Sequence, residues 1–234
     1  MTELELIRQQ LECLSNLKPV SSYILEFQKY ENINRQTLIN NNYIIGEKTG
    51  KFTYENYDEM YRQIKNNGNW QLKLLDDSFI SFYYCFDSQG SVVKCSLSYI
   101  PSINDDALAG RPSKSDRYEA LLYCFMNYIR IDFDETGYEE RVHELQHMHK
   151  GLNLRNKKNG TDESYSGQSD LETFINEIRL PVKRIFFPND FVQFILEYVY
   201  HESLDCVSIN PSVNKRVVIN ETAQNFSIDN IYSN

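Results

Sequence analysis

The chain has 234 residues and a mass of 27.6 kDa, a length that suits one large domain or a core with a small appendage. Hydrophobic residues make up 41% of the chain and aromatic residues 13%, which excludes a disordered tail and a fibrous repeat. The net charge of −9 argues against binding of nucleic acid by bulk electrostatic attraction, although a local basic patch can still bind it. No apolar run approaches the roughly 18 residues of a membrane-spanning helix, so no membrane attachment is expected.

The N-terminus and the cysteines both favour a cytoplasmic protein. Residues 1–7 contain neither the basic nor the apolar region of a secretory signal. The five cysteines are widely spaced and form no C-x-x-C pair: Cys13, Cys85, Cys95, Cys124 and Cys206. This pattern is typical of buried thiols in a reducing compartment, and it argues against both a disulfide framework and a cysteine-only zinc site.

Two helices are predicted in the N-terminal part of the chain. Residues 3–16 place apolar side chains at i, i+3 and i+7, and Thr2 before them is a suitable N-cap. Residues 20–50 are polar, and no regular element is expected there. A second helix is predicted over residues 53–65, where the run 66–69 of Asn and Gly ends it.

The next stretch has the composition of β-strands. Residues 70–75 form one candidate strand, and residues 79–86 and 91–100 are rich in aromatic and β-branched residues around the turn sequence Asp87-Ser88-Gln89-Gly90. Pairing Asp87 with Gly90 predicts a register in which apolar or aromatic side chains face each other: Ile80 with Leu97, Phe82 with Cys95 and Tyr84 with Val93.

The second half of the chain alternates between polar stretches and predicted elements. A loop over 101–115 precedes a predicted helix over 116–126, and the strictly alternating residues 128–134 predict a half-buried strand. A helix over 170–178 is expected to end at Leu180-Pro181-Val182. The last predicted helix runs from Pro188 to about His201 and has an apolar face of four residues: Phe191, Phe194, Ile195 and Tyr198. One more strand is conceivable over 216–219.

The order of these elements predicts an α+β fold with a mostly antiparallel sheet, flanking helices and a single core. Residues 1–66 are expected to form a helical segment that packs on a core domain over residues 67–203. Residues 204–234 are expected to form a partly mobile tail.

Three of the four histidines lie within seven residues, at His143, His147 and His149, and two interpretations of this cluster require different backbones. In a helix, His143-Glu144-x-x-His147 is an H-E-x-x-H motif, in which two imidazoles on one face hold zinc and the glutamate activates water. The third ligand of such a zinc peptidase would be Glu163, Glu172 or Glu177. The motif is short, however, and Arg141 and His149 stand where zinc peptidases favour uncharged residues.

In a strand over residues 145–152, His147 and His149 share one face instead. The strand over 128–134 likewise places Arg130, Asp132 and Asp134 on one face, and a short loop allows the two strands to pair. Asp132, His147 and His149 would then act as catalytic residues or, with His143, as ligands of Zn²⁺, Mn²⁺ or Mg²⁺. Arg130 and Arg155 would hold phosphate. A third alternative is that the cluster is purely structural, because Asp–His and Arg–Asp pairs also stabilise ordinary sheets.

Several spaced motifs resemble a bacterial family of unknown function over about residues 79–201. These motifs are Tyr128-x-Arg130-x-Asp132, His143-x-x-x-His147-x-His149-x-Gly151, Arg179-Leu180-Pro181-Val182 and Pro188-x-x-Phe191-x-x-Phe194-Ile195, followed by Tyr200. Members of the family usually carry Pro after the first His, where this chain has Glu144, and a position that accepts Pro suits a turn into a strand better than a helix interior.

The resemblance implies a biological setting more than a mechanism. Family members are similar to the small partner of a superfamily 2 helicase in two-gene anti-phage defence systems, and the H-x-H with upstream R-x-D is similar to motifs of some small bacterial toxins. The first hypothesis is therefore a nuclease-like hydrolase that meets nucleic acid through its helicase partner. The second is a non-catalytic regulatory or adaptor subunit, whose acidic surface would complement a basic face of the helicase.

Overall fold

The computed structural model describes residues 1–16, 24–27, 43–50, 52, 56–103, 124, 127–135, 146–151, 178–182 and 185–201. Their helices and strands, in chain order, are α1 (Glu3–Asn16), β1 (Ile24–Phe27), β2 (Tyr43–Ile45), α3 (Tyr57–Asn67), β3 (Leu72–Leu74), β4 (Phe79–Phe86), β5 (Val92–Ile100), β6 (Ile129–Asp134), β7 (Gln146–Lys150), β8 (Ile178–Pro181) and α6 (Pro188–Tyr200).

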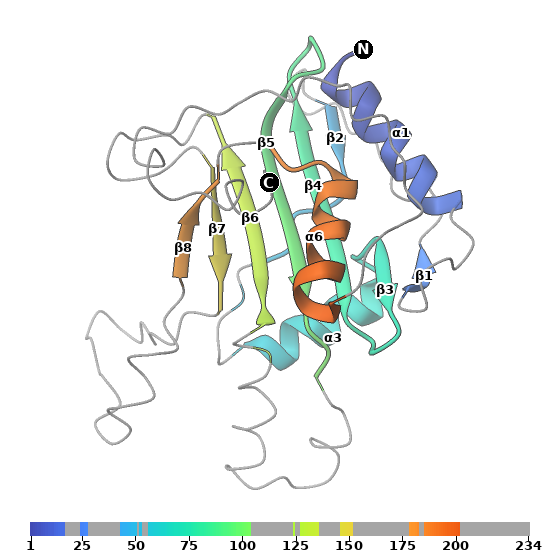
Figure 1. Cartoon of the computed structure of the whole chain (residues 1–234), viewed down its shortest axis with the longest axis vertical. Helices are drawn as coiled ribbons and strands as arrows, with labels where there is room; N and C mark the ends of the chain where they lie inside the picture. The colour runs from blue at the N-terminus through green and yellow to red at the C-terminus, as the bar shows by residue number, and fades with distance from the viewer. Residues whose placement is uncertain are drawn as a thin grey trace, which may run out of the picture.

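All eight described strands join one sheet with the order β1-β3-β4-β5-β6-β7-β8, and β2 pairs with β4 beside β3 (Figure 1). Every recorded pairing is antiparallel. Strands that follow one another along the chain are also neighbours from β3 to β8, which is the expected arrangement for short connections. The predicted α+β fold with a mostly antiparallel sheet and flanking helices is confirmed.

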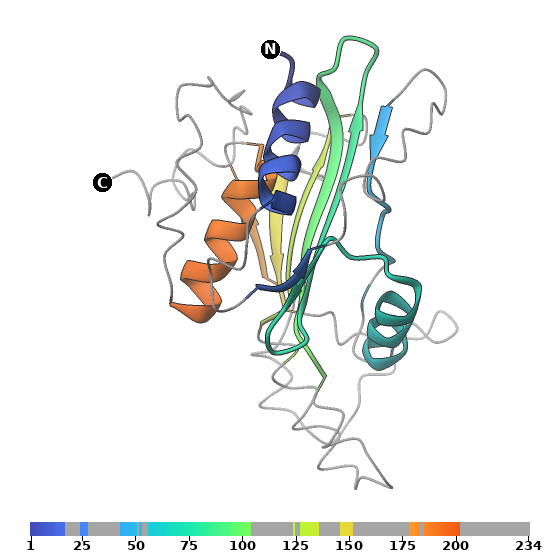
Figure 2. The same ribbon diagram turned by 90° about the vertical axis from the view of Figure 1, so that its right-hand side faces the viewer.

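The helices cover both faces of the sheet. Figure 2 shows α1 and α6 on one side and α3 on the other. The face under α1 and α6, which we call the core face, presents the inward side chains of β4, β5 and β6 to Leu11 of α1 and Phe191 of α6, both fully buried. Burial of this apolar surface is the main contribution to folding stability. A second cluster, formed by Phe52, Tyr57, Tyr61 and their neighbours, lies under α3 at one end of the opposite face.

Local sequence signals explain the ends of the helices. At α1 the backbone N–H of Glu5 donates to Thr2 Oγ1 at 3.2 Å and the Glu5 carboxylate accepts from the Thr2 N–H at 2.8 Å, a reciprocal capping box. Gly68 ends α3 with a left-handed φ of 69°. Pro188 opens α6, and Asp190 accepts from the N–H of Phe187 at 3.1 Å. The predicted bounds of α1 are confirmed at both ends.

The hairpin of β4 and β5 forms as predicted, but its predicted register is wrong by two residues. Phe82 pairs with Leu97 and Tyr84 with Cys95. The turn closes between Asp87 and Ser91, because the Asp87 carboxylate accepts the Ser91 N–H at 2.8 Å, and a bulge at Cys85 and Phe86 adds the second residue of the shift. A shift of two keeps each side chain on its face, so the apolar pattern alone could not exclude it.

Other predictions need correction. Strands β1 and β2 lie in the segment that was expected to be irregular, and they belong to the same sheet as the later strands. Ile178, expected to end a helix, begins strand β8 instead, and Leu180 and Pro181 continue it. Tyr198, expected on the apolar face of α6, is 39% exposed. Of the predicted helix over 116–126, the structure describes only residue 124, and residues 170–177 of the next predicted helix lie outside the described residues. The predicted strand over 216–219 and the tail from residue 202 lie outside them as well.

The cysteines largely follow the prediction of buried thiols. Cys85, Cys95 and Cys124 are buried thiols, whereas the Cys13 thiol is exposed on α1. Burial raises the pKa of the Cys95 thiol, and the nearby Asp132 carboxylate adds to this increase. Burial also raises the pKa of the Cys124 thiol, so the Cys95 and Cys124 thiols stay protonated at neutral pH. Within the described part of the chain, no helix has the length and apolarity needed to cross a membrane.

Candidate functional site

Strands β6 and β7 bring together the residues that the strand interpretation selected. The two strands pair antiparallel, with Asp132 opposite His147 and Arg130 opposite His149. Alternate residues of β6 are buried in the core, so Arg130 and Asp132 point to the opposite face. The predicted pairing and the shared polar face of these four residues are confirmed.

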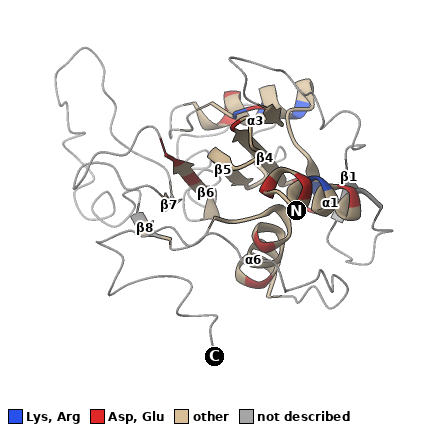
Figure 3. Ribbon diagram, turned by 90° about the horizontal axis from the view of Figure 1, so that it is seen from above, with Lys and Arg blue, Asp and Glu red and all other residues tan. Residues whose placement is uncertain are grey.

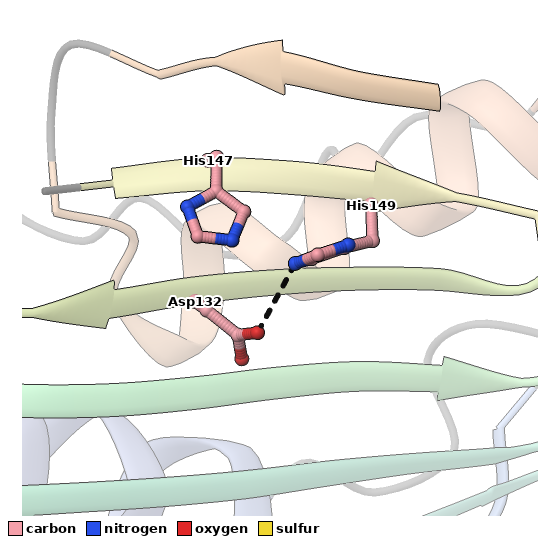
Figure 4. Close-up of side chains that lie close together, drawn as sticks. All are labelled: Asp132, His147 and His149. Carbon is pink, nitrogen blue, oxygen red and sulfur yellow. Dashed lines mark ion pairs between the residues drawn. The ribbon is translucent and has the colours of Figure 1, made fainter. Parts of the chain in front are cut away.

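The two imidazoles and the carboxylate converge on one point. His149 Nε2 lies 3.3 Å from Asp132 Oδ2, and the ring centroids of His147 and His149 are 4.4 Å apart at an angle of 68°. Figure 4 shows both rings extending from β7 over β6 toward Asp132. Each of the three residues offers a ligand atom, and these atoms all lie within 4.8 Å of one another.

Asp132 accepts hydrogen bonds from two side chains and lies 3.3 Å from a third, His149. Ser96 Oγ of β5 donates to Oδ1 at 2.7 Å, and Arg130 Nε donates to Oδ2 at 2.8 Å. Burial alone would raise the pKa of Asp132, but His149, Arg130 and Ser96 outweigh this effect and hold the pKa well below its usual range. The carboxylate is therefore ionised at neutral pH and available as an anionic ligand.

Burial differs between the two sides of the site. His147 is 4% exposed and His149 is 1% exposed, so both imidazoles lie in a low-dielectric environment. The side chains of Asp132 and Arg130 are 24% and 16% exposed, which makes β6 the side from which solvent reaches the cluster. A ligand that enters from solvent would therefore meet the carboxylate and the guanidinium before the imidazoles.

The site lies between two different parts of the same sheet face. On one side, Thr49 Oγ1 lies 3.5 Å from Ser98 Oγ on β5, and the aromatic cluster under α3 follows beyond it. On the other side, Lys94 of β5 pairs with Asp134 of β6. In the view of Figure 3, acidic residues mark the helices α1, α3 and α6 as well as the end of β6. The residues of the site itself are of mixed sign.

The arrangement suits a divalent cation. Two imidazoles and one carboxylate are a common ligand set for Zn²⁺ and for other transition metals, and three protein ligands leave coordination positions open for water or substrate. The carboxylate is ionised, and its hydrogen bond from Ser96 is the kind of supporting contact that orients metal ligands. Asp132, His147 and His149 thus fit a metal centre in both chemistry and distance.

The H-E-x-x-H interpretation is wrong at its second histidine. His147 lies in strand β7, where its neighbours on the same face are at i±2, whereas the zinc peptidase motif needs His147 on a helix one turn after His143. His143 and Glu144 lie outside the described residues, as do Arg155 and the proposed third ligands Glu163, Glu172 and Glu177.

Ser96 is a functional candidate that sequence reasoning missed. Its hydroxyl is the closest partner of the Asp132 carboxylate, at 2.7 Å, although 36 residues separate the two positions. A serine in a strand carries no signal of its own. The register of β5 against β6, which pairs Ser96 with Asp132, would have identified it.

Comparison with known proteins places the chain in a family but gives no activity. Residues 23–158 match the family of uncharacterized conserved proteins named DUF2290. This segment is more than half of the chain and contains Asp132, His147 and His149, and the chain therefore belongs to that family. No curated protein and no solved structure matches. The matched segment includes β1 and β2 and ends before β8, whereas the family resemblance of the sequence motifs was expected to cover about residues 79–201.

Proposed function

We propose that this member of the DUF2290 family is a nuclease-like hydrolase that uses a divalent metal ion to cleave phosphodiesters. The observation that carries the proposal is the convergence of Asp132, His147 and His149, whose ligand atoms lie within 4.8 Å of one another. Asp132 supplies the negative charge of the ligand set and the histidines supply neutral nitrogen donors. Imidazoles favour Zn²⁺ over Mn²⁺ and Mg²⁺, which bind mainly oxygen ligands.

Each residue of the site has a role in this chemistry. A bound divalent metal supplies a Lewis acid and lowers the pKa of its water. Asp132 is ionised and, with its Oδ1 held by Ser96, keeps the ligand set in place. Arg130, with its guanidinium at the solvent side of the cluster, binds the phosphate of the substrate. The predicted contribution of Arg155 to phosphate binding remains part of the proposal.

Metal content provides the first test. The untagged protein is purified and its metals are measured by mass spectrometry, for the wild type and for the double variant His147→Ala/His149→Ala. His201→Ala is the matched control, because His201 is an exposed histidine at the end of α6. We expect about one metal per chain in the wild type and in His201→Ala and none in the double variant. Equal metal content in all three proteins would refute the ligand assignment.

Catalysis is tested with single-stranded and double-stranded DNA and RNA in the presence of Zn²⁺, Mn²⁺ or Mg²⁺. Cleavage by the wild type that disappears in a folded His149→Ala variant would support the proposal. If the wild type binds metal but cleaves none of these substrates, even with its partner present, the metal centre is structural and the hydrolase proposal fails.

We further propose that the hydrolase acts in anti-phage defence as the small partner of a superfamily 2 helicase in the cytoplasm. The family resemblance of the sequence motifs supports this setting, and nucleic acid would reach the site through the helicase. Co-purification with the helicase and loss of protection in the His149→Ala variant are the expected results. Full protection by a folded His149→Ala variant would overturn the catalytic role.

Full protection by the His149→Ala variant would favour a different function, that of a non-catalytic regulatory or adaptor subunit. Two observations favour it specifically. The imidazoles are almost completely buried, as structural residues are, and the net charge of −9 suits a basic protein partner. An adaptor would bind the helicase normally and protect cells regardless of substitutions at His147 and His149.

A further inference from the structure

We infer that Arg130 and a bound metal ion compete for one oxygen of Asp132, and that metal binding releases the guanidinium to bind a phosphate-type anion. The inference rests on the proposed metal centre and adds a coupling between the two ligands. Metal and anion would bind cooperatively, and Arg130 would be the residue that links them.

The geometry of the carboxylate creates a competition. Asp132 Oδ1 is held by Ser96, whereas Oδ2 is shared by Arg130 Nε at 2.8 Å and His149 Nε2 at 3.3 Å. A metal bound between Asp132 and the imidazoles must approach Oδ2, because this is the oxygen that faces His149. The guanidinium already occupies that oxygen. Two cations within hydrogen-bond distance of one oxygen repel each other strongly in a partly buried site, so the guanidinium must turn away.

The charge of the loaded site then requires an anion. In their ion pair, Asp132 and Arg130 neutralise each other. With a divalent metal and two neutral imidazoles, the same set of groups carries a net charge of +2. The next carboxylate on this face of β6, Asp134, is paired with Lys94. A net charge in a half-buried site is costly unless an oppositely charged group balances it, and a bound anion provides that balance.

The released side chain is suited to a tetrahedral oxyanion. A guanidinium presents a planar fork of N–H donors that matches two phosphate oxygens, and open metal positions bind a third. The stem of Arg130 is held in strand β6 and its side chain is 16% exposed, so the head group has a small distance to move and remains beside the metal. A phosphodiester or a phosphate monoester has the required charge and shape.

The inference is testable because one substitution of Arg130 should strengthen metal binding while it weakens the coupling between metal and anion. Arg130→Gln removes the competitor for Oδ2 and should tighten metal binding about tenfold. The same substitution should weaken the effect of metal on anion binding, which in the wild type should be roughly 5- to 150-fold, the usual range of coupling between two sites. Arg130→Lys keeps the positive charge but lacks the fork, so it should bind the metal as the wild type does and the anion more weakly.

The experiment uses the full chain, Co²⁺ as a spectroscopic probe and phenylphosphonate, a phosphate analogue that a hydrolase cannot cleave. Visible absorption gives the Kd of Co²⁺, and calorimetry gives the Kd of phenylphosphonate with and without Co²⁺. Lys94→Gln is the matched control, because it also removes a cation from an ion pair with a β6 carboxylate. Its partner Asp134 is the next residue after Asp132 on the same face of β6. Thermal unfolding establishes that each variant is folded.

The outcomes separate this inference from the proposed function. Tighter Co²⁺ binding by Arg130→Gln than by Lys94→Gln, together with a smaller Co²⁺ effect on the Kd of phenylphosphonate than in the wild type, supports the inference. If the wild type binds Co²⁺ but Arg130→Gln binds it equally or more weakly, the competition is refuted and the metal centre stands. If the wild type binds no Co²⁺ at all, the proposed metal centre itself is refuted.

Discussion

Two carboxylates of β6 differ in their partners far more than in their exposure, and their removal should have unequal effects on stability. Asp132 is 24% exposed and Asp134 is 20% exposed. Asp132 interacts with Ser96, Arg130 and His149, and the ion pair of Asp134 is with Lys94. Asp132→Asn and Asp134→Asn are therefore a matched pair of substitutions on one strand.

The size of the difference follows from these contacts. Loss of a hydrogen bond to a charged group costs about 1.5–3 kcal/mol, and breaking a buried ion pair costs about 3–5 kcal/mol. The effects of the three neighbouring side chains on Asp132 are not additive, and an asparagine can still accept one bond. We therefore expect Asp132→Asn to lower the free energy of unfolding by about 2–3 kcal/mol. In the Lys94–Asp134 pair the lysine side chain is 34% exposed, against 16% for Arg130, and a pair with such access to solvent is worth about 1 kcal/mol or less.

The difference should depend on pH in one direction. The pKa of Asp132 in the folded protein lies below its unfolded value, which is about 3.9. A carboxylate of this kind contributes stability that is present above the unfolded pKa and is lost as the pH falls through the folded pKa. The cost of Asp132→Asn should thus be constant between pH 7 and about pH 5 and should shrink below about pH 4.

Urea unfolding in the presence of a chelator measures these free energies without a contribution from bound metal. The wild type and both variants are compared at pH 7, 5 and 3 under conditions where the transitions are reversible. If Asp132→Asn costs no more than Asp134→Asn at pH 7, or if its cost grows as the pH falls, the account of Asp132 as an anion held by three neighbouring side chains is wrong.

Three further predictions test individual contacts. Ser96→Ala should weaken Co²⁺ binding about 10- to 100-fold because the hydroxyl orients Asp132, whereas Ser98→Ala, one position along the same face, should leave it unchanged in the same titration. Gly46→Ala should lower the free energy of unfolding by about 2–3 kcal/mol, since φ is +75° and a Cβ would lie 1.9 Å from a backbone oxygen of β4. Gly50→Ala, whose Cβ would meet only the flexible end of a methionine, should cost less in the same urea experiment. Tyr84→Phe removes a buried hydrogen bond of 2.9 Å to a backbone carbonyl that precedes α6, and it should lower the unfolding free energy by about 1–3 kcal/mol.

The site could be predicted from the sequence because polar residues recur at every second position in both β6 and β7. In β6, isoleucine and phenylalanine alternate with arginine and aspartate, so the strand, its two faces and the direction of Asp132 all follow from the order of the residues. His147 and His149 then share a face in any strand. The pairing of β6 with β7 required only that a short connection joins neighbouring antiparallel strands.

Elements without such a pattern could not be predicted. Strand β2 has three residues and β1 has four, which is too short for alternation to show. Strand β8 contains Pro181, which usually marks the end of an element but is tolerated where a strand pairs on one side. The hairpin register depended on an aspartate hydrogen bond and a bulge, and both are properties of the folded backbone.

Tyr198 shows how tertiary contacts override a helical pattern. Its spacing places it with Phe191 and Phe194, and its ring does stack on Phe194 with centroids 5.4 Å apart. It nevertheless lies at the edge of the core, where the ammonium of Lys150 sits 4.7 Å from its ring centroid. The contact with β7 could not be inferred from the helix alone.

The segment that defines the family is smaller than the unit that folds. Helices α1 and α6 both lie outside residues 23–158, yet they cover the core face of the sheet and contact each other, with Gln10 accepting the N–H of Asn189 at 3.1 Å. A fragment cut at the family boundaries would leave Phe82, Leu97 and Ile131 facing water on one continuous apolar surface, a feature that drives aggregation. Expression of the protein for study therefore has to include both flanking helices, and relatives are best compared over the whole folding unit rather than over the conserved segment alone.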